Sequence, residues 1–113
     1  MSAEGFEARV RERGATTVID LIGEINARAE DALGSAYDEA TRGTPDRVLL
    51  NFRDASYINS TGIALIVGVL ARARRDGIPM LAAGLSEHYR QIFEITRLAD
   101  FMTIFPDEAS AVA

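Results

Sequence analysis

The order of hydrophobic and polar residues predicts two strands at the start of the chain. Residues 6–11 alternate between apolar and polar side chains, which is typical of a half-buried strand. Residues 16–22 are rich in β-branched and apolar residues, so they predict a more buried strand that ends at Gly23. Gly14 marks a turn between the two segments, and we expect the strands to pair antiparallel.

Helical spacing of apolar residues marks the first helix. Over residues 27–41, small and aliphatic residues recur at this spacing, with acidic residues and Arg28 on the other face. The residues predicted to face the core are Ala29, Leu33, Ala36 and Ala40. Gly43 and Pro45 end the helix, and residues 48–52 then form a short apolar strand that we expect to be covered on both faces.

Helices and strands continue to alternate in the second half of the chain. A helix is predicted over residues 60–75, ended by residues 76–79, and a strand over residues 80–83 follows it. Ser86 caps a third helix. The residues that share one face of this helix are Tyr89, Ile92, Phe93 and Thr96.

The C-terminal residues give a weaker signal. Residues 101–105 fit either a strand or a short apolar turn, and packing in the core is favoured over a role as partner surface. Pro106 opens a short helix over residues 107–112. Strands that alternate with helices need crossover connections. The sequence therefore predicts a single α/β domain over residues 1–113, with a mixed, mostly parallel sheet of four to five strands packed by three to four helices.

Composition and charge exclude several classes of function. The net charge of −5 argues against direct nucleic-acid binding, because neutralising phosphates needs a basic face. The chain has no cysteine, and its one histidine, His88, has no second histidine near it, so neither a metal nor another cofactor is expected. No stretch is apolar enough to insert into a membrane, and residues 1–10 lack the pattern of a signal peptide. A cytoplasmic location is the resulting expectation.

The most informative segment is residues 54–62, with the sequence DASYINSTG, followed at once by an apolar run over residues 63–70. It places the hydroxyl of Ser60 at a helix N-terminus, where backbone N–H groups and the helix dipole favour negative charge. Such a site can hold a phosphate. The simplest alternative is that Ser60 is only the N-cap of this helix, since serine is one of the preferred capping residues.

The helix that begins at Ser60 has two apolar faces of different character. The face predicted to meet the core consists of Ile63, Ile66, Val67, Leu70 and Ala73. The opposite face is small and mostly uncharged, and consists of Thr61, Ala64, Gly68, Ala71 and Arg75. Gly68 costs about 1 kcal/mol relative to Ala in mid-helix, and small residues let another backbone approach closely. The face is thus predicted to bind a partner, unless Gly68 only marks tight packing on a neighbouring element.

Motifs in three parts of the chain resemble the STAS domain, in the small bacterial form of the anti-sigma-factor antagonists. The pattern D-x-S-x-I-N-S-T-G of residues 54–62 resembles the signature of that family. Gly23-Glu24-Ile25-Asn26 resembles its Gly-Glu-hydrophobic-Asp turn after the second strand. Residues 85–98 resemble its next-to-last segment, which typically ends in a Phe-x-x-x-Gly-Leu pattern. The order and spacing of these segments fit the family over essentially the whole chain.

The resemblance implies a non-enzymatic switch between partners. In the family, the serine that matches Ser60 is phosphorylated by an anti-sigma factor that is itself a serine kinase. The unphosphorylated antagonist binds this kinase, phosphorylation ends the binding, and a PP2C-type phosphatase restores it. The residues expected to bind the partner are Glu24, Asn26, Asn59, Ser60, Thr61, Gly62, Ala64 and Gly68.

Two residues depart from the family pattern. Asn59 precedes the candidate serine and Asn26 ends the Gly-Glu turn, where many members have Asp. Asn keeps the shape and capping ability of Asp but loses its charge. If the acids of the family help the kinase to orient the hydroxyl, phosphorylation is expected to be slower here or restricted to a particular partner.

Two other functions compete with this interpretation. The chain also fits a STAS subunit of a lipid-transport ABC complex or of a stress-sensing scaffold, which would use the same helix face without a phosphate cycle. An enzyme or a nucleotide-binding protein is the second rival. The absence of a phosphate-binding glycine loop and of a catalytic pair of side chains argues against it.

Overall fold

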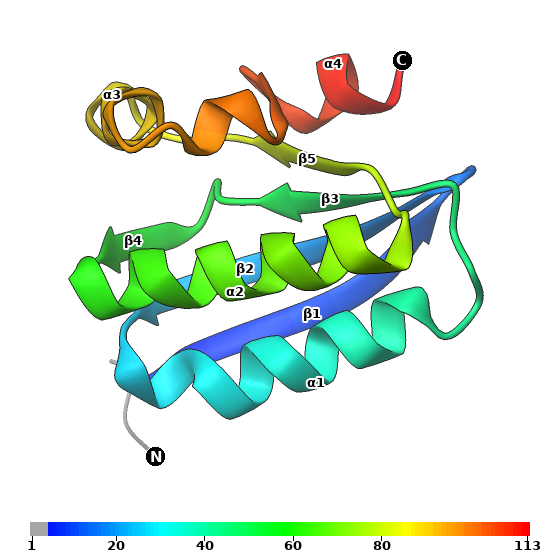
Figure 1. The fold of residues 1–113 in the computed structure, drawn as a ribbon, viewed down its shortest axis with the longest axis horizontal. Coiled ribbons are helices and arrows are strands. Elements are labelled where there is room, and N and C mark those ends of the chain that lie inside the picture. Colours follow the sequence, from blue (N-terminus) through cyan, green and yellow to red (C-terminus); the bar gives the residue numbers. More distant parts are fainter. Residues whose placement is uncertain (1–4) are drawn as a thin grey trace.

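The computed structural model describes residues 5–113, so residues 1–4, part of the stretch considered for a signal peptide, lie outside it. Within the described chain, six strands form one sheet with helices packed on it (Figure 1). The strands are β1 (Phe6–Arg13), β2 (Thr16–Ile25), β3 (Arg47–Asn51), β4 (Ala55–Ile58), β5 (Met80–Ala83) and β6 (Thr103–Phe105). The helices are α1 (Glu30–Thr41), α2 (Ser60–Asp76), α3 (Glu87–Ile95) and α4 (Glu108–Val112), with 3-10 turns η1 (Ala27–Ala29) and η2 (Leu98–Asp100).

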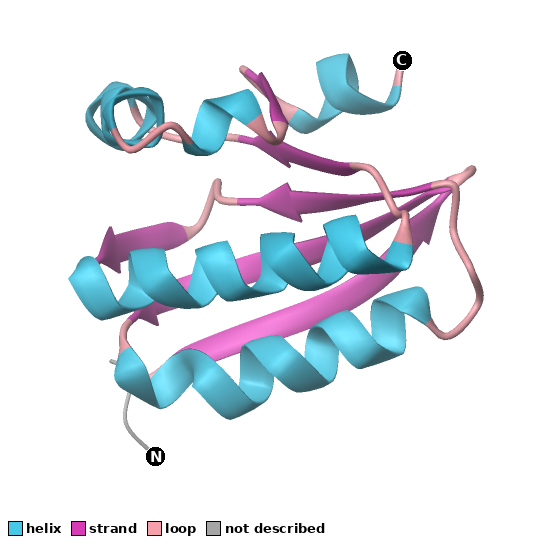
Figure 2. Ribbon diagram, viewed as in Figure 1, coloured by secondary structure: helices cyan, strands magenta, loops and turns pink. Residues whose placement is uncertain are grey.

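Strand β2 holds the sheet together. On one side it pairs antiparallel with β1, and on the other it pairs parallel first with β3 and then with β4. Strands β5 and β6 extend the sheet beyond β3, again parallel, to give the order β1-β2-β3-β5-β6. Figure 2 shows the sheet as one twisted layer, with α1 and α2 packed against the part that contains β1 and β2. The predicted antiparallel first pair and mostly parallel sheet are therefore confirmed.

Alternation along the strands divides the core into a large and a small part. Successive side chains of a strand point to opposite faces of the sheet. Ile19 and Leu50 belong to the large cluster, which α1, α2 and α3 cover, whereas their neighbours Val18 and Leu49 pack with Ala111 of α4 in the small one. Both faces of β3 are thus covered, as its apolar sequence predicts.

The helix boundaries follow the predicted signals closely. The four residues predicted to face the core from the first helix are all buried, Ala29 in η1 and Leu33, Ala36 and Ala40 in α1. Helix α2 ends at Gly77, which has the left-handed φ of +74° that suits a glycine C-cap. Ser86 caps α3 by accepting a hydrogen bond from the backbone N–H of Tyr89, as predicted.

Within residues 5–113, no helix combines the length and the apolar character needed to cross a bilayer.

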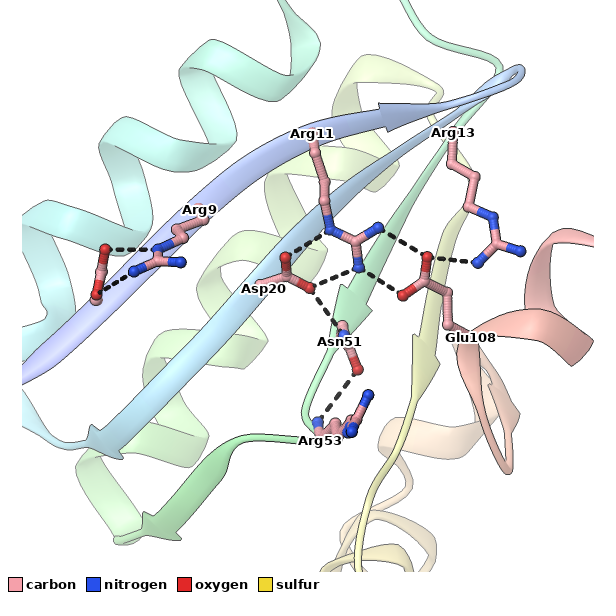
Figure 3. Close-up of polar contacts among 8 residues, drawn as sticks. Arg9, Arg11, Arg13, Asp20, Asn51, Arg53 and Glu108 are labelled. Atoms are coloured by element: carbon pink, nitrogen blue, oxygen red, sulfur yellow. Dashed lines mark hydrogen bonds and ion pairs between the residues drawn. The ribbon is translucent and has the colours of Figure 1, made fainter.

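A polar network attaches α4 to the sheet (Figure 3). Arg11 of β1 donates to both carboxylate oxygens of Asp20 and of Glu108, and Arg13 donates to Glu108 over 2.7 Å. Asn51 donates to Asp20 over 2.8 Å from the neighbouring strand. The two guanidinium groups lower the pKa of Glu108 to about 2. Two arginines of β1 thus hold the last helix in place, and Asp20 and Asn51 of the neighbouring strands complete the network.

The structure corrects the predicted number and length of strands. The sheet has six strands instead of four to five, because residues 103–105 resolve the C-terminal ambiguity as β6 and Ala55–Ile58 forms β4. Strand β2 does not end at Gly23 but continues to Ile25, with a bulge between Gly23 and Glu24. Strands β4 and β6 are too short to show a clear alternation of their own. Pairing with a neighbouring strand makes them strands, and a sequence pattern does not contain that neighbour.

Two local predictions about helices are also wrong. Val67 is 45% exposed, although helical projection places it on the core face, and Val69 is buried instead. The rotation of α2 about its axis is set by packing against α1 and the sheet, which a single helix cannot reveal. Pro106 does not lie in the first turn of α4, because Asp107 is the N-cap and Glu108 the first helical residue.

Candidate functional site

The start of α2 is capped by Asn59, not by Ser60. The side-chain oxygen of Asn59 accepts a hydrogen bond of 2.8 Å from the N–H of Gly62. The backbone N–H of Asn59 donates to the carbonyl of Ile25 over 3.3 Å, which ties the cap to the end of β2. The alternative that Ser60 serves only as the N-cap is therefore ruled out. Ser60 is the first helical residue, and it is exposed.

Gly62 lies beneath the surface that it was expected to form. It is buried, and a Cβ atom there would come within 2.0 Å of the Ile25 carbonyl oxygen. Real side chains do not approach a backbone oxygen so closely. Gly62 thus lets the first turn of α2 rest directly on β2, and its contribution to a partner surface is to position Ser60 and Thr61.

The second predicted part of the site lies beside this turn. Glu24 and Ile25 pair with Tyr57 and Ile58 of β4, immediately before α2 begins. Asn26 caps η1 by accepting a hydrogen bond of 2.9 Å from the N–H of Arg28. Residues 23–26 are thus a strand end followed by a cap, and not the expected turn. Parallel pairing of β2 with β4 nevertheless brings Glu24 and Asn26 to the same sheet edge as Ser60.

The small-residue face of α2 points to solvent. All five predicted members are exposed: Thr61, Ala64, Gly68, Ala71 and Arg75. A Cβ atom at Gly68 would meet nothing within 4 Å, so tight packing on a neighbouring element does not explain this glycine. A groove of about 360 Å³ runs between α1 and α2, and Gly34, Ala64 and Gly68 line it. The structure therefore leaves this face uncovered along the helix.

The electrostatics of the first turn suit a negative charge. Helix α2 has 17 residues and no acidic residue in its first turn, while Arg74 and Arg75 lie in its last turn. Its free N–H groups and its dipole therefore face Ser60 without a competing carboxylate on the same turn. Of the three arginines near the other end, Arg72 bonds to Asp38 of α1, which ties the two helices together.

Sequence reasoning missed two residues near this site. Tyr57 is 54% exposed on β4, three residues before Ser60. Tyr89 of α3 accepts a hydrogen bond of 3.0 Å from the N–H of Ile58 and so fixes the end of β4. Tyr57 stands within the signature segment, and its alternation with Ile58 would have shown it. The helical pattern placed Tyr89 on one face of the third helix but gave no sign of its bond to β4. No group of three or more potential metal ligands gathers in residues 5–113.

Comparison with known proteins shows to which family this chain belongs. Residues 7–111 match the model of the STAS domain. The chain belongs to the STAS domain family. Among curated relatives, the anti-sigma-B factor antagonist of Staphylococcus aureus is 36% identical over 62 residues, which are 55% of this chain and 56% of the relative. The chain thus spans about half the length of the curated relatives that it matches.

Solved structures of this family share the fold. An anti-sigma factor antagonist from Mycobacterium paratuberculosis superposes with a TM-score of 0.78 at 17% identity, over 98% of this chain and 94% of that one. The Bacillus cell fate determinant SpoIIAA in its phosphorylated form superposes with a TM-score of 0.68 at 23% identity, over 96% of each chain. The STAS fold predicted from the sequence is therefore confirmed.

Proposed function

We propose that this STAS domain is an anti-sigma-factor antagonist and acts as a non-enzymatic switch between partners. Unphosphorylated, it binds a serine-kinase anti-sigma factor; phosphorylated on Ser60, it releases that kinase. One observation carries the proposal. Asn59, and not Ser60, caps α2, so the Ser60 hydroxyl is exposed at the rim of an uncovered small-residue face.

The environment of Ser60 supports a phosphate that leaves the fold intact. A phosphoryl group adds a charge of about −1.5 to −2 and three acceptor oxygens. Free N–H groups at the start of α2 favour such a charge, and the first turn carries no carboxylate. The phosphorylated SpoIIAA structure has the same fold as this chain, which is consistent with a change confined to the surface.

The effect of the phosphate would be felt at the interface. On a surface where small residues admit close approach, a dianion in place of a hydroxyl must lose its hydration when the partner docks. A difference of about 3 kcal/mol in binding free energy changes the affinity roughly a hundredfold. The partner surface would include the exposed members of the predicted set, namely Ser60, Thr61, Ala64 and Gly68, and also the half-buried Glu24 and Asn26.

The two asparagines bear on how the switch is operated. Asn59 and Asn26 both cap their turns through a side-chain oxygen, which is what an aspartate would do there. Their neutral side chains make these caps without bringing the negative charge of an aspartate to the surface. We expect a kinase that orients the Ser60 hydroxyl without these acids, and a PP2C-type phosphatase in the same cytoplasmic compartment.

The test compares two variants of Ser60 in a binding assay with the cognate kinase. Ser60→Glu is expected to abolish binding, whereas Ser60→Ala is expected to bind but to stay bound in the presence of ATP. Ser35→Glu, which adds the same charge at an exposed position on α1, is the matched control and should bind like the wild type. Equal binding by both Ser60 variants contradicts the mechanism.

Mass spectrometry after incubation with the kinase and ATP locates the modified residue. Phosphate found only outside Ser60 rejects the assignment. Recovery of a transporter ATPase instead of a small kinase in a pull-down would favour the alternative of a transport or scaffold subunit. That alternative uses the same exposed face of α2 and needs no phosphate cycle.

A further inference from the structure

A shallow apolar hollow lies on the other side of α2 from the groove beside α1. It has a volume of about 230 Å³ and lies between the middle of α2 and the segment that leads from α3 into η2. Val67 and Ala71 contribute from α2, and Leu98 and Phe101 from the second segment. Two parts of the chain that are distant in sequence thus build one concave surface.

The hollow exposes more apolar area than the packing of this chain requires. Val67 is 45% exposed and Phe101 50%, although both are large hydrophobic residues next to the core residue Leu98. Ile95, at the end of α3 and just before this segment, is 79% exposed. Single exposed hydrophobic residues are ordinary, but Val67 and Phe101 line the same hollow, and exposed apolar residues that gather in this way are typical of an interaction surface.

Two arginines border this hollow. The guanidinium of Arg74 lies 4.7 Å from the centroid of the Phe101 ring, and within residues 5–113 it makes no ion pair. Arg97 donates to Asp100 over 2.6 Å, but its side chain is 78% exposed, so this pair contributes little and is easily exchanged. The rim is therefore positive on a chain whose net charge is −5.

Arg97 follows α3 in the left-handed conformation with which helices often end, where glycine is the usual residue. Its φ of +69° lies in the left-handed region, where glycine is the unstrained residue and a side chain costs conformational energy. The Arg97 side chain is mostly exposed, so the chain gains no buried contact from it. An arginine in place of the less strained glycine thus puts a positive charge at the edge of the apolar hollow.

We propose that this hollow is a second docking surface, distinct from the Ser60 surface, for an acidic protein segment with an apolar anchor. An aliphatic or aromatic side chain of the partner enters between Val67 and Phe101 and removes their exposed area from water. Carboxylates on either side of that anchor pair with Arg74 and Arg97, the latter exchanging its contact with Asp100. This inference does not depend on phosphorylation of Ser60.

Two synthetic peptides of equal length test the proposal by NMR titration of the isotope-labelled chain. One repeats leucine flanked by glutamates, and the other has lysine in place of each glutamate. The acidic peptide is expected to shift the amide signals of Val67, Ala71, Leu98 and Phe101 at millimolar concentration, and the basic peptide to leave them unchanged. Shifts by both peptides, by neither, or only elsewhere on the chain overturn the proposal.

Charge reversal at the rim tests the role of the arginines. Arg74→Glu is expected to weaken binding of the acidic peptide about five- to tenfold, because it replaces an attraction with a repulsion. Arg42→Glu, the same change at an exposed position after α1, is the matched control and should bind like the wild type. Equal loss in both variants would show a non-specific effect of net charge and would reject the site.

Arg97→Gly separates a binding role from a structural one. The glycine relieves the left-handed strain, so the variant is expected to melt at a higher temperature and yet to bind the acidic peptide several-fold more weakly. A variant that melts higher and binds as well as the wild type removes Arg97 from the site. Vesicles of anionic phospholipid that shift the same signals, with no effect of the acidic peptide, would replace a protein partner with a membrane surface.

Discussion

Two glycines of α2 occupy opposite environments, although they lie six residues apart on one helix. Gly62 rests on the carbonyl of Ile25 with no space for a side chain, while Gly68 faces open solvent. The first is required by the contact between helix and strand. The second costs helix stability and gains no contact within the chain, which is what a residue kept for a partner's approach would show.

Alanine at each of these positions is expected to change stability in opposite directions. Gly62→Ala should destabilise the fold by about 2 kcal/mol or more, because the added Cβ collides with backbone. Gly68→Ala should stabilise it by about 0.5–1 kcal/mol, since Ala has the better helix propensity and open space around it. Unfolding in urea measures both values, and a loss of stability in Gly68→Ala would show that this face is not open.

Helix α4 illustrates how an element depends on contacts made elsewhere. It has five residues, too few to be stable by itself. Ala111 packs on Val18 and Leu49 in the small core, and Glu108 bonds to Arg11 and Arg13. The helix is therefore part of the fold only while these contacts persist, and its stability should depend on the charge of Glu108.

The stabilisation from Glu108 is expected to depend on pH. Its pKa falls from 4.5 to about 2 on folding, so the ionised form stabilises the native state above about pH 4.5. This contribution shrinks as the pH falls from about 4.5 towards 2, where the folded protein also takes up the proton. The difference in unfolding free energy between wild type and Glu108→Gln should therefore be constant near neutral pH and vanish near pH 2.

Urea unfolding at a series of pH values provides the measurement. Glu94→Gln is the control, because Glu94 lies 3.9 Å from Arg90 in an exposed pair. Its effect on the unfolding free energy should stay within about 0.5 kcal/mol at every pH. If Glu108→Gln loses no more stability than this control, the network of Figure 3 does not hold α4 to the sheet.

At the scale of the whole molecule, the sheet fixes the relative positions of the residues in the candidate partner surface. Parallel pairing of β2 with β4 places Glu24, Asn26 and Ser60 along one edge of the sheet. The core residues beneath them are buried. The groove beside α1 and the apolar hollow between Val67 and Phe101 lie on two sides of the same helix, α2. A substitution or a phosphate at Ser60 should therefore alter only its immediate surroundings and leave the rest of the fold in place.

Ser60→Glu is thus expected to leave the fold unchanged. Negative charge in the first turn of α2 is favourable to the helix dipole, so the melting temperature should rise slightly or stay within about 3 °C of the wild type. Changes in NMR chemical shift should be confined to the start of α2, the end of β2 and η1. Widespread changes would mean that the switch works by rearranging the fold instead of by altering the interface.

Most of the element order is visible in local patterns, and the exceptions have a common cause. The period of the apolar residues marks β1, α1 and α2, and turn or cap residues such as Gly77 and Ser86 mark where helices stop and start. Strand β4 and the exposure of Val67 are different, because each is set by a neighbour distant in sequence. Pattern analysis sees one element at a time and cannot supply that neighbour.

The candidate site also combines features that the sequence predicts with features that only tertiary contacts produce. The signature segment and the helix after it identify Ser60 from sequence, and chemistry alone predicts that a phosphate is tolerated there. That Asn59 makes the cap and Gly62 is buried follows from the contact of both with Ile25. The strained Arg97 and the hollow beside Phe101 likewise exist only once α2 meets the segment after α3.

By itself, then, the amino-acid sequence determines most of the elements and their order, because periodicity, capping and turn chemistry act over a few residues. Its motifs also indicate the family and the candidate serine. The tertiary structure alone decides which side chains stay exposed: it buries Gly62, frees the Ser60 hydroxyl and leaves Gly68 and Val67 uncovered. Exposure depends on how helices rotate and dock on the sheet. Those rotations minimise the free energy of the whole core, and no local stretch of sequence contains them.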